Sequence, residues 1–505
     1  MRFGGRRSVT MILAATSAAC MMAVAGPGGA MAGTRAVGAP RAAALSGTWR
    51  TARAVPGISA LNQGGRAQVN SVSCTSPGNC SAGGWYTDHR GVSQAFLVSE
   101  VKGTWQKAIR VPGTFGPNKY YGQLDAVSCA SAGNCSAGGF YVNNNGNQAF
   151  AVSEVNGVWH RAIEVPGSAA LNSGGYAELT SVSCATPGNC TAGGYYLAGA
   201  TSYQAFVVRE VNGTWRKAIR VPGIVSPPAG GHVGPTAQVT SVSCASAGNC
   251  SIGGSYYDSV NIQAFVGRQV NGVWRKAVKV PGSATLNQGD AQVNSVSCGS
   301  AGNCSAGGWY TDSRGYEQLM VVNEVNGTWR HAIEVPGSAA LNKGDYARIV
   351  SVSCGSAGNC SAGGSYMDGS SLDNPLVVSE ANGTWQKATR VPGMTALTQH
   401  IFGIATTVSC ASAGNCTAGG WYTDSADLSQ PFVVDEVNGT WHNAVKVRGI
   451  DALNQGNDAG ITAVSCGSAG NCSALGVYTD SSGDYQVFAV SKARLRHADN
   501  LLLSG

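Results

Sequence analysis

The chain has 505 residues with 71 glycines and 17 cysteines, and only 12% of its residues are charged. Its 43% hydrophobic content is too high for a disordered protein, and its glycines lack the three-residue period of collagen. The net charge of +7 is modest for this length and gives no reason to expect nucleic acid as a partner.

The N-terminus has the features of an export signal. Arg2, Arg6 and Arg7 precede the apolar run Val9–Ala25, and Ala30-Met31-Ala32 has the form of a cleavage site. We therefore expect a signal peptide at 1–32, a linker at 33–45 and a secreted mature protein whose net charge is +4 once the three arginines are removed. Downstream of the signal, no run of about 18 apolar residues predicts a membrane-spanning helix.

Two alternatives remain for this segment: a retained membrane anchor, and a lipoprotein signal that uses Cys20. Ser17 stands where a lipoprotein signal has a large aliphatic residue, which argues against the second alternative.

Loss of Cys20 with the signal leaves 16 cysteines, which form eight copies of one C-x5-C spacing. The first cysteines of successive copies are 54 to 60 residues apart, and a fixed period of this length predicts a repeat architecture. Each pair brackets a short turn, so we expect a disulfide across it; a zinc site would need further ligands, and no histidine recurs nearby. The expected pairs are Cys74 with Cys80, Cys129 with Cys135, Cys184 with Cys190, Cys244 with Cys250, Cys298 with Cys304, Cys354 with Cys360, Cys410 with Cys416, and Cys466 with Cys472.

Each repeat contains four strand-like runs, called here A to D. In the first repeat they are Gln68–Cys74, Cys80–Thr87, Gln94–Val101 and Thr104–Val111. Between C and D most repeats carry Asn-Gly, the strongest short hairpin signal. Four antiparallel strands per repeat form one blade of a β-propeller.

The two ends of the repeat region predict how the ring closes. The region begins with an unpaired strand D at Gly47–Gly57 and ends after a strand C near Ser491. If the first strand completes the last blade, residues 46–494 form a closed, all-β, eight-bladed propeller with a 3+1 seam, and 495–505 are a tail. An open solenoid is the alternative, but it would need atypical capping repeats. The strand D tryptophans, expected to pack between sheets, are Trp49, Trp105, Trp159, Trp215, Trp274, Trp329, Trp385 and Trp441.

The B–C and D–A loops vary most, and we expect them to share one face that carries the function. Aromatic rings stack on sugars while Asn, Asp and Gln bond to hydroxyl groups, so their recurrence in these loops fits a shallow carbohydrate site. The same polar residues are also ordinary turn formers, and that interpretation stays open. The candidate ligand-binding residues are Asn62, Trp85, Asp88, Gln94, Asn172, Asn287, Trp309, Asp312, Gln318, Asn342, Trp421, Asp424, Gln430, Asn454 and Asp480.

Signatures of catalysis are missing from the sequence. It has no G-x-S-x-G, no H-E-x-x-H and no phosphate-binding loop, so we name no catalytic residue, no metal ligand and no cofactor. Calcium in loops such as Asp480–Asp484 is a weaker possibility, because the ligand spacing of a defined site is missing. Three divergent D–A loops, at 114–124, 224–238 with His232 and 394–405 with His400, are the places where one unique site would lie.

The eight S-V-S-C-x-S-x-G-N-C-x-A-G-G segments resemble repeats of exported actinobacterial proteins. Gln-Ala-Phe-x-Val at Gln94, Gln148 and Gln204 is loosely similar to HAF extracellular repeats, and propeller lectins are similar in architecture only. The resemblance covers 46–494 and implies a repeat type and export, with no catalytic residue to transfer.

Together these observations predict a secreted, monomeric, non-catalytic and multivalent binding protein for glycans or another extracellular polymer. An enzyme (glycoside hydrolase, lyase or quinone-dependent oxidoreductase) and a protein-binding scaffold are the alternatives.

Overall fold

The computed structural model describes residues 47–114, 119–227, 236–370, 372–398 and 402–493. The expected signal peptide, linker and tail, together with His232 and His400, lie outside the described residues.

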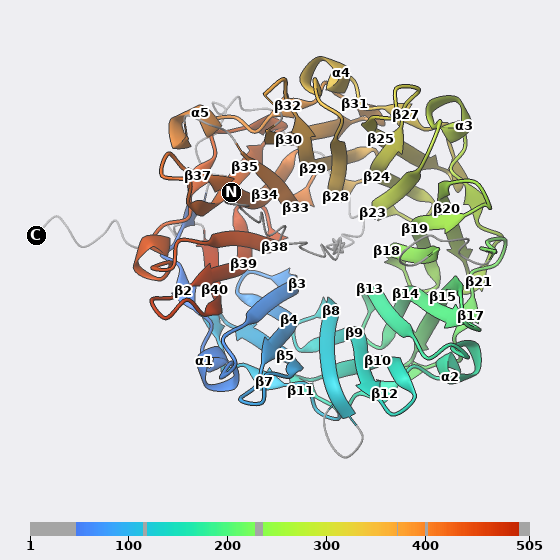
Figure 1. Ribbon diagram of the computed structural model, residues 1–505, viewed down its shortest axis with the longest axis horizontal. Coiled ribbons are helices and arrows are strands. Elements are labelled where there is room, and N and C mark those ends of the chain that lie inside the picture. The colour runs from blue at the N-terminus through green and yellow to red at the C-terminus, as the bar shows by residue number, and fades with distance from the viewer. Residues whose placement is uncertain (1–46, 115–118, 228–235, 371, 399–401, 494–505) are drawn as a thin grey trace, which may run out of the picture.

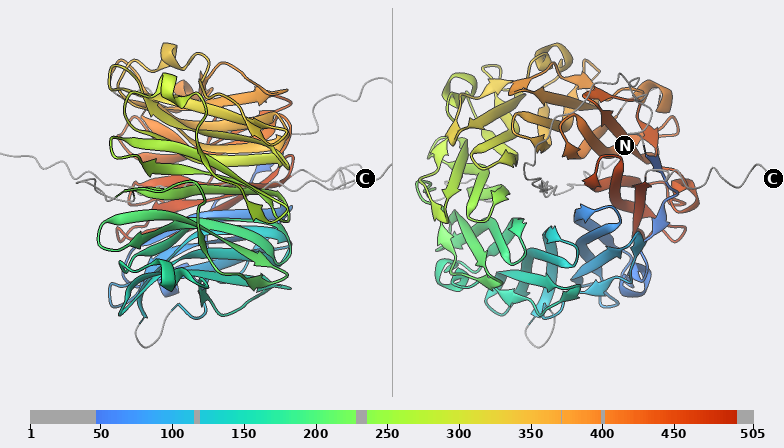
Figure 2. Two further views of the ribbon diagram at one scale, coloured as in Figure 1. Left: turned by 90° about the vertical axis from the view of Figure 1, so that its right-hand side faces the viewer. Right: turned by 180° about the vertical axis from the view of Figure 1, so that it is seen from behind.

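Eight antiparallel sheets surround a central axis and form a closed eight-bladed β-propeller, as predicted (Figures 1 and 2). We number the blades by their strand A, so that blade 1 begins at β3 and blade 8 at β38. Strand A lies nearest the axis in every blade. The A strands are β3 (Ala67–Ser76), β8 (Lys119–Ser131), β13 (Ala177–Thr186), β18 (Ala237–Ser246), β23 (Ala291–Ser300), β28 (Ala347–Ser356), β33 (Gly403–Ser412) and β38 (Ala459–Ser468).

Strands B and C follow outward from the axis. The B strands are β4 (Asn79–Thr87), β9 (Asn134–Asn143), β14 (Asn189–Ala198), β19 (Asn249–Tyr257), β24 (Asn303–Thr311), β29 (Asn359–Met367), β34 (Asn415–Thr423) and β39 (Asn471–Thr479). The C strands are β5 (Ser93–Val101), β10 (Gly146–Val155), β15 (Ser202–Val211), β20 (Ile262–Val270), β25 (Glu317–Val325), β30 (Asp373–Ala381), β35 (Ser429–Val437) and β40 (Tyr485–Ala493).

Strand D differs from the prediction, because it is two short pieces rather than one run. In blade 1 the N–H of Ala108, between the pieces, donates to the carbonyl of Pro56 in the neighbouring blade instead of to strand C. The equivalent bond recurs in every blade and links the outer rim into a ring. The pieces are β6 (Thr104–Trp105) and β7 (Ile109–Arg110), β11 (Val158–Trp159) and β12 (Ile163–Glu164), β16 (Thr214–Trp215) and β17 (Ile219–Arg220), β21 (Val273–Trp274) and β22 (Val278–Lys279), β26 (Thr328–Trp329) and β27 (Ile333–Glu334), β31 (Thr384–Trp385) and β32 (Thr389–Arg390), and β36 (Thr440–Trp441) and β37 (Val445–Lys446).

Short helices in the D–A loops were not predicted. Each follows a glycine with positive φ, such as Gly57 at 76°. Four residues are too few for a helical hydrophobic pattern, so the sequence carried little signal for them. They are α1 (Ile58–Leu61), α2 (Ser168–Leu171), α3 (Ser283–Leu286), α4 (Ser338–Leu341) and α5 (Met394–Leu397), with the 3₁₀ turn η2 (Ile450–Ala452) in the last such loop.

The ring closes as a 3+1 seam. β1 (Thr48–Trp49) and β2 (Arg53–Ala54) pair antiparallel with β40 and supply strand D of blade 8. The first and last described segments of the chain are thus held in one sheet, and the sheet edge that an open array would leave is covered.

All eight predicted disulfides are present, each joining strands A and B of one blade. Their Cα atoms lie 3.8 to 4.0 Å apart, because each pair occupies directly opposite positions of the hairpin. Eight disulfides are typical of proteins that fold in an oxidising, extracytoplasmic compartment. The bonded pairs are Cys74 with Cys80, Cys129 with Cys135, Cys184 with Cys190, Cys244 with Cys250, Cys298 with Cys304, Cys354 with Cys360, Cys410 with Cys416, and Cys466 with Cys472.

The second cysteine of a pair also contacts the preceding blade, which the sequence did not predict. Its sulfur lies 3.3 to 3.5 Å from the hydroxyl oxygen of a serine or threonine on strand B there. The contacts join Cys135 to Ser81, Cys190 to Ser136, Cys250 to Thr191, Cys304 to Ser251, Cys360 to Ser305, Cys416 to Ser361, and Cys472 to Thr417. Each of these disulfides therefore packs against its neighbour as well as closing its own hairpin.

Among the described residues, no helix is long and apolar enough to cross a membrane.

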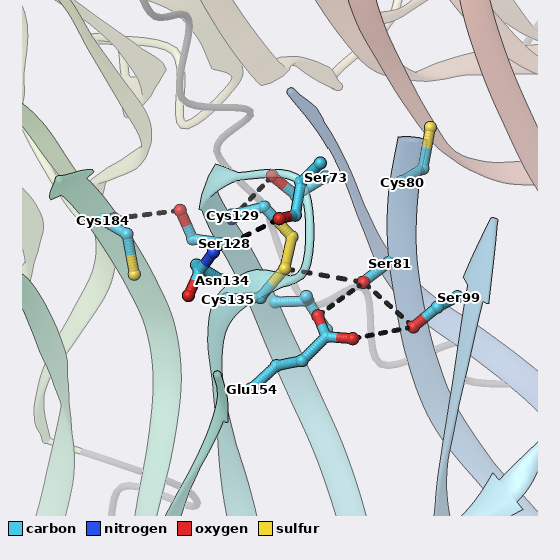
Figure 3. Close-up of a disulfide and its surroundings, with 12 residues drawn as sticks. Ser73, Cys80, Ser81, Ser99, Ser128, Cys129, Asn134, Cys135, Glu154 and Cys184 are labelled. Atoms are coloured by element: carbon cyan, nitrogen blue, oxygen red, sulfur yellow. Dashed lines mark hydrogen bonds between the residues drawn. A yellow bond between two sulfur atoms is a disulfide. The ribbon is translucent and has the colours of Figure 1, made fainter. Parts of the chain in front are cut away.

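A ring of side-chain-to-backbone hydrogen bonds joins the innermost strands. The serine before each first cysteine accepts from the N–H of the first cysteine in the next blade, as Ser73 does from Cys129 at 2.9 Å and Ser128 from Cys184 (Figure 3). The bond recurs at all eight interfaces, including Ser465 to Cys74 where blade 8 meets blade 1. The repeated S-V-S-C segment therefore builds the interface between blades as well as the disulfide.

A buried carboxylate ties strand C to the preceding blade. Glu154 of blade 2 accepts hydrogen bonds from Ser81 and Ser99 of blade 1 at 3.2 and 3.3 Å (Figure 3). Burial raises the pKa of Glu154, and the two serine hydrogen bonds offset this only in part. In blade 8 a positive side chain replaces the negative one: Lys492 occupies the Glu position and forms an ion pair with Asp435 of blade 7 at 2.9 Å.

The core consists of apolar clusters between adjacent blades. The tyrosine after the Gly-Gly of strand B is buried in most blades, with Tyr86 fully so, as expected for a packing residue. The strand D tryptophans also pack between blades: Trp215 is 7% exposed, and its Nε1 donates to Ser153 of the neighbouring blade.

In six blades the β-bulge residue of strand A donates a hydrogen bond to the next blade. Asn70 and Asn294 donate through Nδ2 to the carbonyls of Leu124 and Ile349, and threonines make the equivalent bond in four further blades. In blade 2 this residue is Asp125, which is 1% exposed. Its Oδ1 accepts from Gln123, just as Asn70 Oδ1 accepts from Gln68, so Oδ2 takes the place of the amide donor.

Asp125 Oδ2 has no hydrogen-bond partner within the described part of the chain. Burial, with a smaller contribution from Glu178, raises the pKa of Asp125 well above its ordinary value. A protonated Asp125 would supply a donor where Asn70 has its amide, and an ionised one would leave a buried charge without a hydrogen-bond donor at Oδ2. The neutral form is therefore the one that fits the ring.

The free energy of unfolding of the wild type should therefore depend on pH, and Asp125→Asn should remove this dependence. The folded pKa is raised, so the stabilisation is complete below the unfolded value of about 3.9 and is lost as pH rises through the folded pKa. At pH 8 the variant should unfold with a free energy about 1 to 3 kcal/mol higher than wild type, the cost of an unsatisfied buried group, and the difference should shrink toward pH 3. Denaturant titrations at several pH values measure it.

The reverse change is the matched control. Asn294→Asp installs the same carboxylate in blade 5, beside Gln292, and should introduce a new loss of stability at pH 8. Equal stability of Asp125→Asn and wild type across this range would show that Asp125 is not held in its neutral form.

Candidate functional site

The B–C and D–A loops lie together on one face, called here the loop face. Gly64 in a D–A loop donates to the carbonyl of Thr87, where the B–C loop of blade 1 begins, and Asn62 reaches Tyr485 of blade 8. On the opposite face the A–B and C–D turns meet, as the bond from Gly103 to Gly78 illustrates. Each D–A loop thus lies between the B–C loops of two successive blades.

The predicted loop asparagines are held inside the loops. Asn62, Asn172, Asn342 and Asn454 are buried, and each donates through Nδ2 to a carbonyl at the start of a strand C. Asn287 is half-buried and donates to Gly289 within its own loop. Their amide donors therefore fix loop geometry.

The aspartate and glutamine residues of the B–C loops form one repeated unit. Asp312 Oδ1 accepts from the N–H groups of Arg314 and Tyr316, and its Oδ2 accepts from Gln318 Nε2 at 3.1 Å. The pairs Asp88/Gln94, Asp424/Gln430 and Asp480/Gln486 repeat this arrangement. The sequence pattern therefore marks a side-chain-closed turn, with both carboxylate oxygens occupied.

The lowered pKa values of Asp312 and Asp88 indicate that the carboxylate of this unit is ionised. Burial raises the pKa of Asp312, but hydrogen bonds from Arg314 and from the N–H of Tyr316 outweigh it, so that the pKa is lowered overall. The pKa of Asp88 is lowered in the same way by Arg90 and Val92.

The three predicted tryptophans remain partly accessible. Trp85, Trp309 and Trp421 lie near the loop-face end of strand B and are half-buried. The Cβ of Trp421 is within 3.1 Å of the position that a side chain on Gly460 of blade 8 would take. In the other blades this position holds Phe140, Tyr195, Ser255, Ser365 and Val477, all buried.

An arginine that the sequence had not singled out lies over Trp309. The guanidinium carbon of Arg348, on blade 6, lies 4.4 Å from the Trp309 ring centroid and 4.9 Å from that of Tyr346, and Arg348 also pairs with Glu317. Four blades carry glutamine at the Arg348 position, so the departure from the repeat was the available signal.

A second departure lies in blade 3. The rings of Tyr176 and Tyr195 stack at 5.8 Å, Tyr203 meets both edge-on, and Tyr195 donates to Glu178 at 2.8 Å. Burial raises the pKa of Glu178 to about 7. Glu178 replaces the glutamine of other blades, as Arg348 does in blade 6.

Cavities lie elsewhere, in gaps between the blades at the outer rim. One between blades 1 and 2 has a volume of about 380 Å³ and is lined by residues such as Gln106, Ile109 and Trp159. In the described part of the chain, no group of three or more His, Cys, Asp or Glu side chains is placed to hold a metal ion.

No family model and no curated protein sequence matches the chain. Among solved structures it is similar to Sqt1 of Chaetomium thermophilum bound to the N-terminus of ribosomal protein L10 (13% identity, 86% of this chain and 98% of that chain, TM-score 0.49). It is also similar to a subtype N11 neuraminidase-like protein of A/flat-faced bat/Peru/033/2010 (10%, 90% and 96%, 0.35) and to the fucose-specific lectin from Aleuria aurantia (11%, 75% and 95%, 0.34). At these identities and TM-scores the likenesses assign no ligand to this chain.

The turn unit makes a prediction for blade 7. Asp424→Ala removes the acceptor for the N–H groups of Ala426 and Leu428 and leaves Gln430 unpaired. These two amides should exchange with deuterium about tenfold faster than in wild type, equivalent to about 1.4 kcal/mol of lost local stability, measured by hydrogen exchange. Asp427→Asn, which removes a carboxylate from the same loop, should leave both rates unchanged. Unaltered exchange in Asp424→Ala would contradict the structural role of the aspartate.

Proposed function

We propose that this protein is a secreted, non-catalytic, multivalent binding protein that recognises glycans or a related extracellular polymer on its loop face. The observation that carries the proposal is the partial exposure of Trp85, Trp309 and Trp421 at equivalent positions near the loop-face ends of three B strands.

An indole ring offers a flat apolar face to the C–H groups of a sugar and costs little conformational entropy to order. Neighbouring side chains hold two of these rings: Arg348 lies over Trp309, and Phe402 packs against Trp421. Trp421 meets Phe402 edge-on with centroids 5.3 Å apart. Such a ring is preorganised, which favours shallow binding.

The asparagine, aspartate and glutamine residues that accompany the rings support the site indirectly. Their side chains close the turns beside the tryptophans, so in this proposal Asn62, Asp88 and Gln94 and their counterparts position the loops around each ring. Hydroxyl groups of the sugar would then meet backbone groups and the loop side chains that stay exposed.

Three corresponding positions on one rigid ring favour binding to a repeating ligand, with one face of Trp309 covered by Arg348. Each site alone would be weak, but a polymer that engages two or three of them at once gains avidity of about 10² to 10⁴. The disulfides and the hydrogen-bonded inner ring keep the distances between sites fixed.

The test replaces the rings with residues that the repeat already uses. Trp85→Ser, Trp309→Ser and Trp421→Ser follow Ser255 and Ser365, which occupy this position in blades 4 and 6. Each single change should weaken binding to the best polysaccharide from a glycan array by about tenfold, and the triple change should abolish it. Isothermal titration calorimetry measures affinity and stoichiometry.

Val273→Ser is the control, because Val273 is 58% exposed at a C–D turn on the opposite face. It should bind as wild type does. Failure of the wild-type protein to bind any glycan or cell-wall polymer, or full binding by the triple variant, would refute the proposal.

A further inference from the structure

Clefts with equivalent linings lie on the outer rim between blades 1 and 2, blades 2 and 3, and blades 8 and 1, and we call them rim clefts. Each is lined by strand D of one blade and by the strand D tryptophan of the next. The cleft between blades 1 and 2 contains Gln106, Ile109 and Trp159, and the cleft between blades 2 and 3, of about 440 Å³, contains the counterparts His160, Ile163 and Trp215.

The rim cleft at the seam, between blades 8 and 1, is larger and chemically different. Its volume is about 680 Å³, and it contains Arg50, Arg53, Trp105 and Arg448. Arg53 replaces the aliphatic residue represented by Ile109, and Arg448 replaces the proline that ends strand D in the other seven blades. This one cleft therefore contains two arginines at positions where most other blades have apolar residues.

Backbone geometry brings these arginines to the same place. The N–H of Ala52 donates to the carbonyl of Arg448 at 2.8 Å, so Arg448 lies directly beside the segment that carries Arg50 and Arg53. All three arginines are exposed, and none forms an ion pair with a described residue.

No described Asp or Glu lines this cleft, whereas Glu154 lines the clefts on both sides of blade 2. The counterpart in blade 1, Glu100, lines a neighbouring cleft that shares Arg50. Glu100 is 2% exposed, and its two oxygens accept from Ser473 and Ser491. Asp435 is likewise engaged, by Lys492 and by Trp49 Nε1. Arg50 is attracted electrostatically to the buried Glu100, whereas the positive charges of Arg53 and Arg448 are left to solvent.

We propose that the seam rim cleft is a binding site for the oxyanion groups of an acidic polysaccharide: sulfate esters, phosphate esters or uronates. Guanidinium groups form paired hydrogen bonds with such oxyanions and lose less hydration than an ammonium group does. Trp105 is half-buried in the cleft and offers a ring beside the anion site. The site is single, because the arginines at 53 and 448 occur in this one blade pair, and it is independent of the loop-face tryptophans.

The test restores the repeat's own residues in the full secreted chain. Arg53→Ile and Arg448→Pro install what most other blades have, so the fold should be retained. Wild type should bind dextran sulfate or polygalacturonate at least tenfold more tightly than neutral dextran, and the double variant should lose at least tenfold of that affinity, measured by calorimetry at 0.05 and 0.15 M NaCl. The two polymers distinguish an ester oxyanion from a carboxylate.

Arg216→Gln is the matched control, because Arg216 occupies the Arg50 position in blade 3, away from the seam; it should change affinity by less than twofold. If the double variant is poorly secreted, Arg53→Gln alone, an exposed change, replaces it, with at least a threefold loss expected. An equal loss in Arg216→Gln, an unchanged double variant, or wild-type binding no tighter to either acidic polymer than to neutral dextran would overturn the proposal. Loss of neutral glycan binding on the loop face would leave these results unaffected.

Discussion

The innermost strand of each blade has an edge that no further strand can cover, and the structure depends on how that edge is paired. Serine hydroxyls of one blade accept from the cysteine N–H groups of the next, and bulge residues such as Asn70 donate to carbonyls there. Side chains thereby replace the missing strand, because unpaired buried backbone groups are costly. Small residues let the strands approach: a Cβ on Gly84 would lie 2.0 Å from the Gln68 carbonyl oxygen.

The same serine and cysteine residues pair this edge in all eight blades. The residues that depart from the repeat supply additional titratable and charged groups. Asp125, Glu178 and Arg348 replace neutral residues near the inner strands, while Arg53 and Arg448 replace apolar ones at the rim. None of these changes disturbs the ring of serine-to-cysteine hydrogen bonds, since the serine and cysteine positions stay the same. A propeller of this kind can therefore vary its surfaces blade by blade without losing closure, which is consistent with a binding protein that holds different sites on one rigid body.

The sequence predicted the blade count, the seam and the disulfides, because each rests on a repeated local signal such as C-x5-C or Asn-Gly. It did not predict the break in strand D, since the bond from Ala108 to Pro56 joins different blades. For the candidate site, composition located the loop face but could not separate turn residues from ligand residues: Asp312 and Gln318 bond to each other six positions apart. The contacts of Arg348 with Trp309 and Tyr346 span two blades and needed coordinates.

Native-state hydrogen exchange of the cysteine amides tests the central claim most directly. The N–H groups of Cys74, Cys129 and their counterparts point away from strand B, so their protection depends on the serine of the preceding blade. If that ring holds the propeller closed, all eight amides should exchange as slowly as the amides of β4 and β9, through global unfolding alone. Exchange of these amides at the rate of exposed turn residues, with the strands themselves protected, would contradict the account.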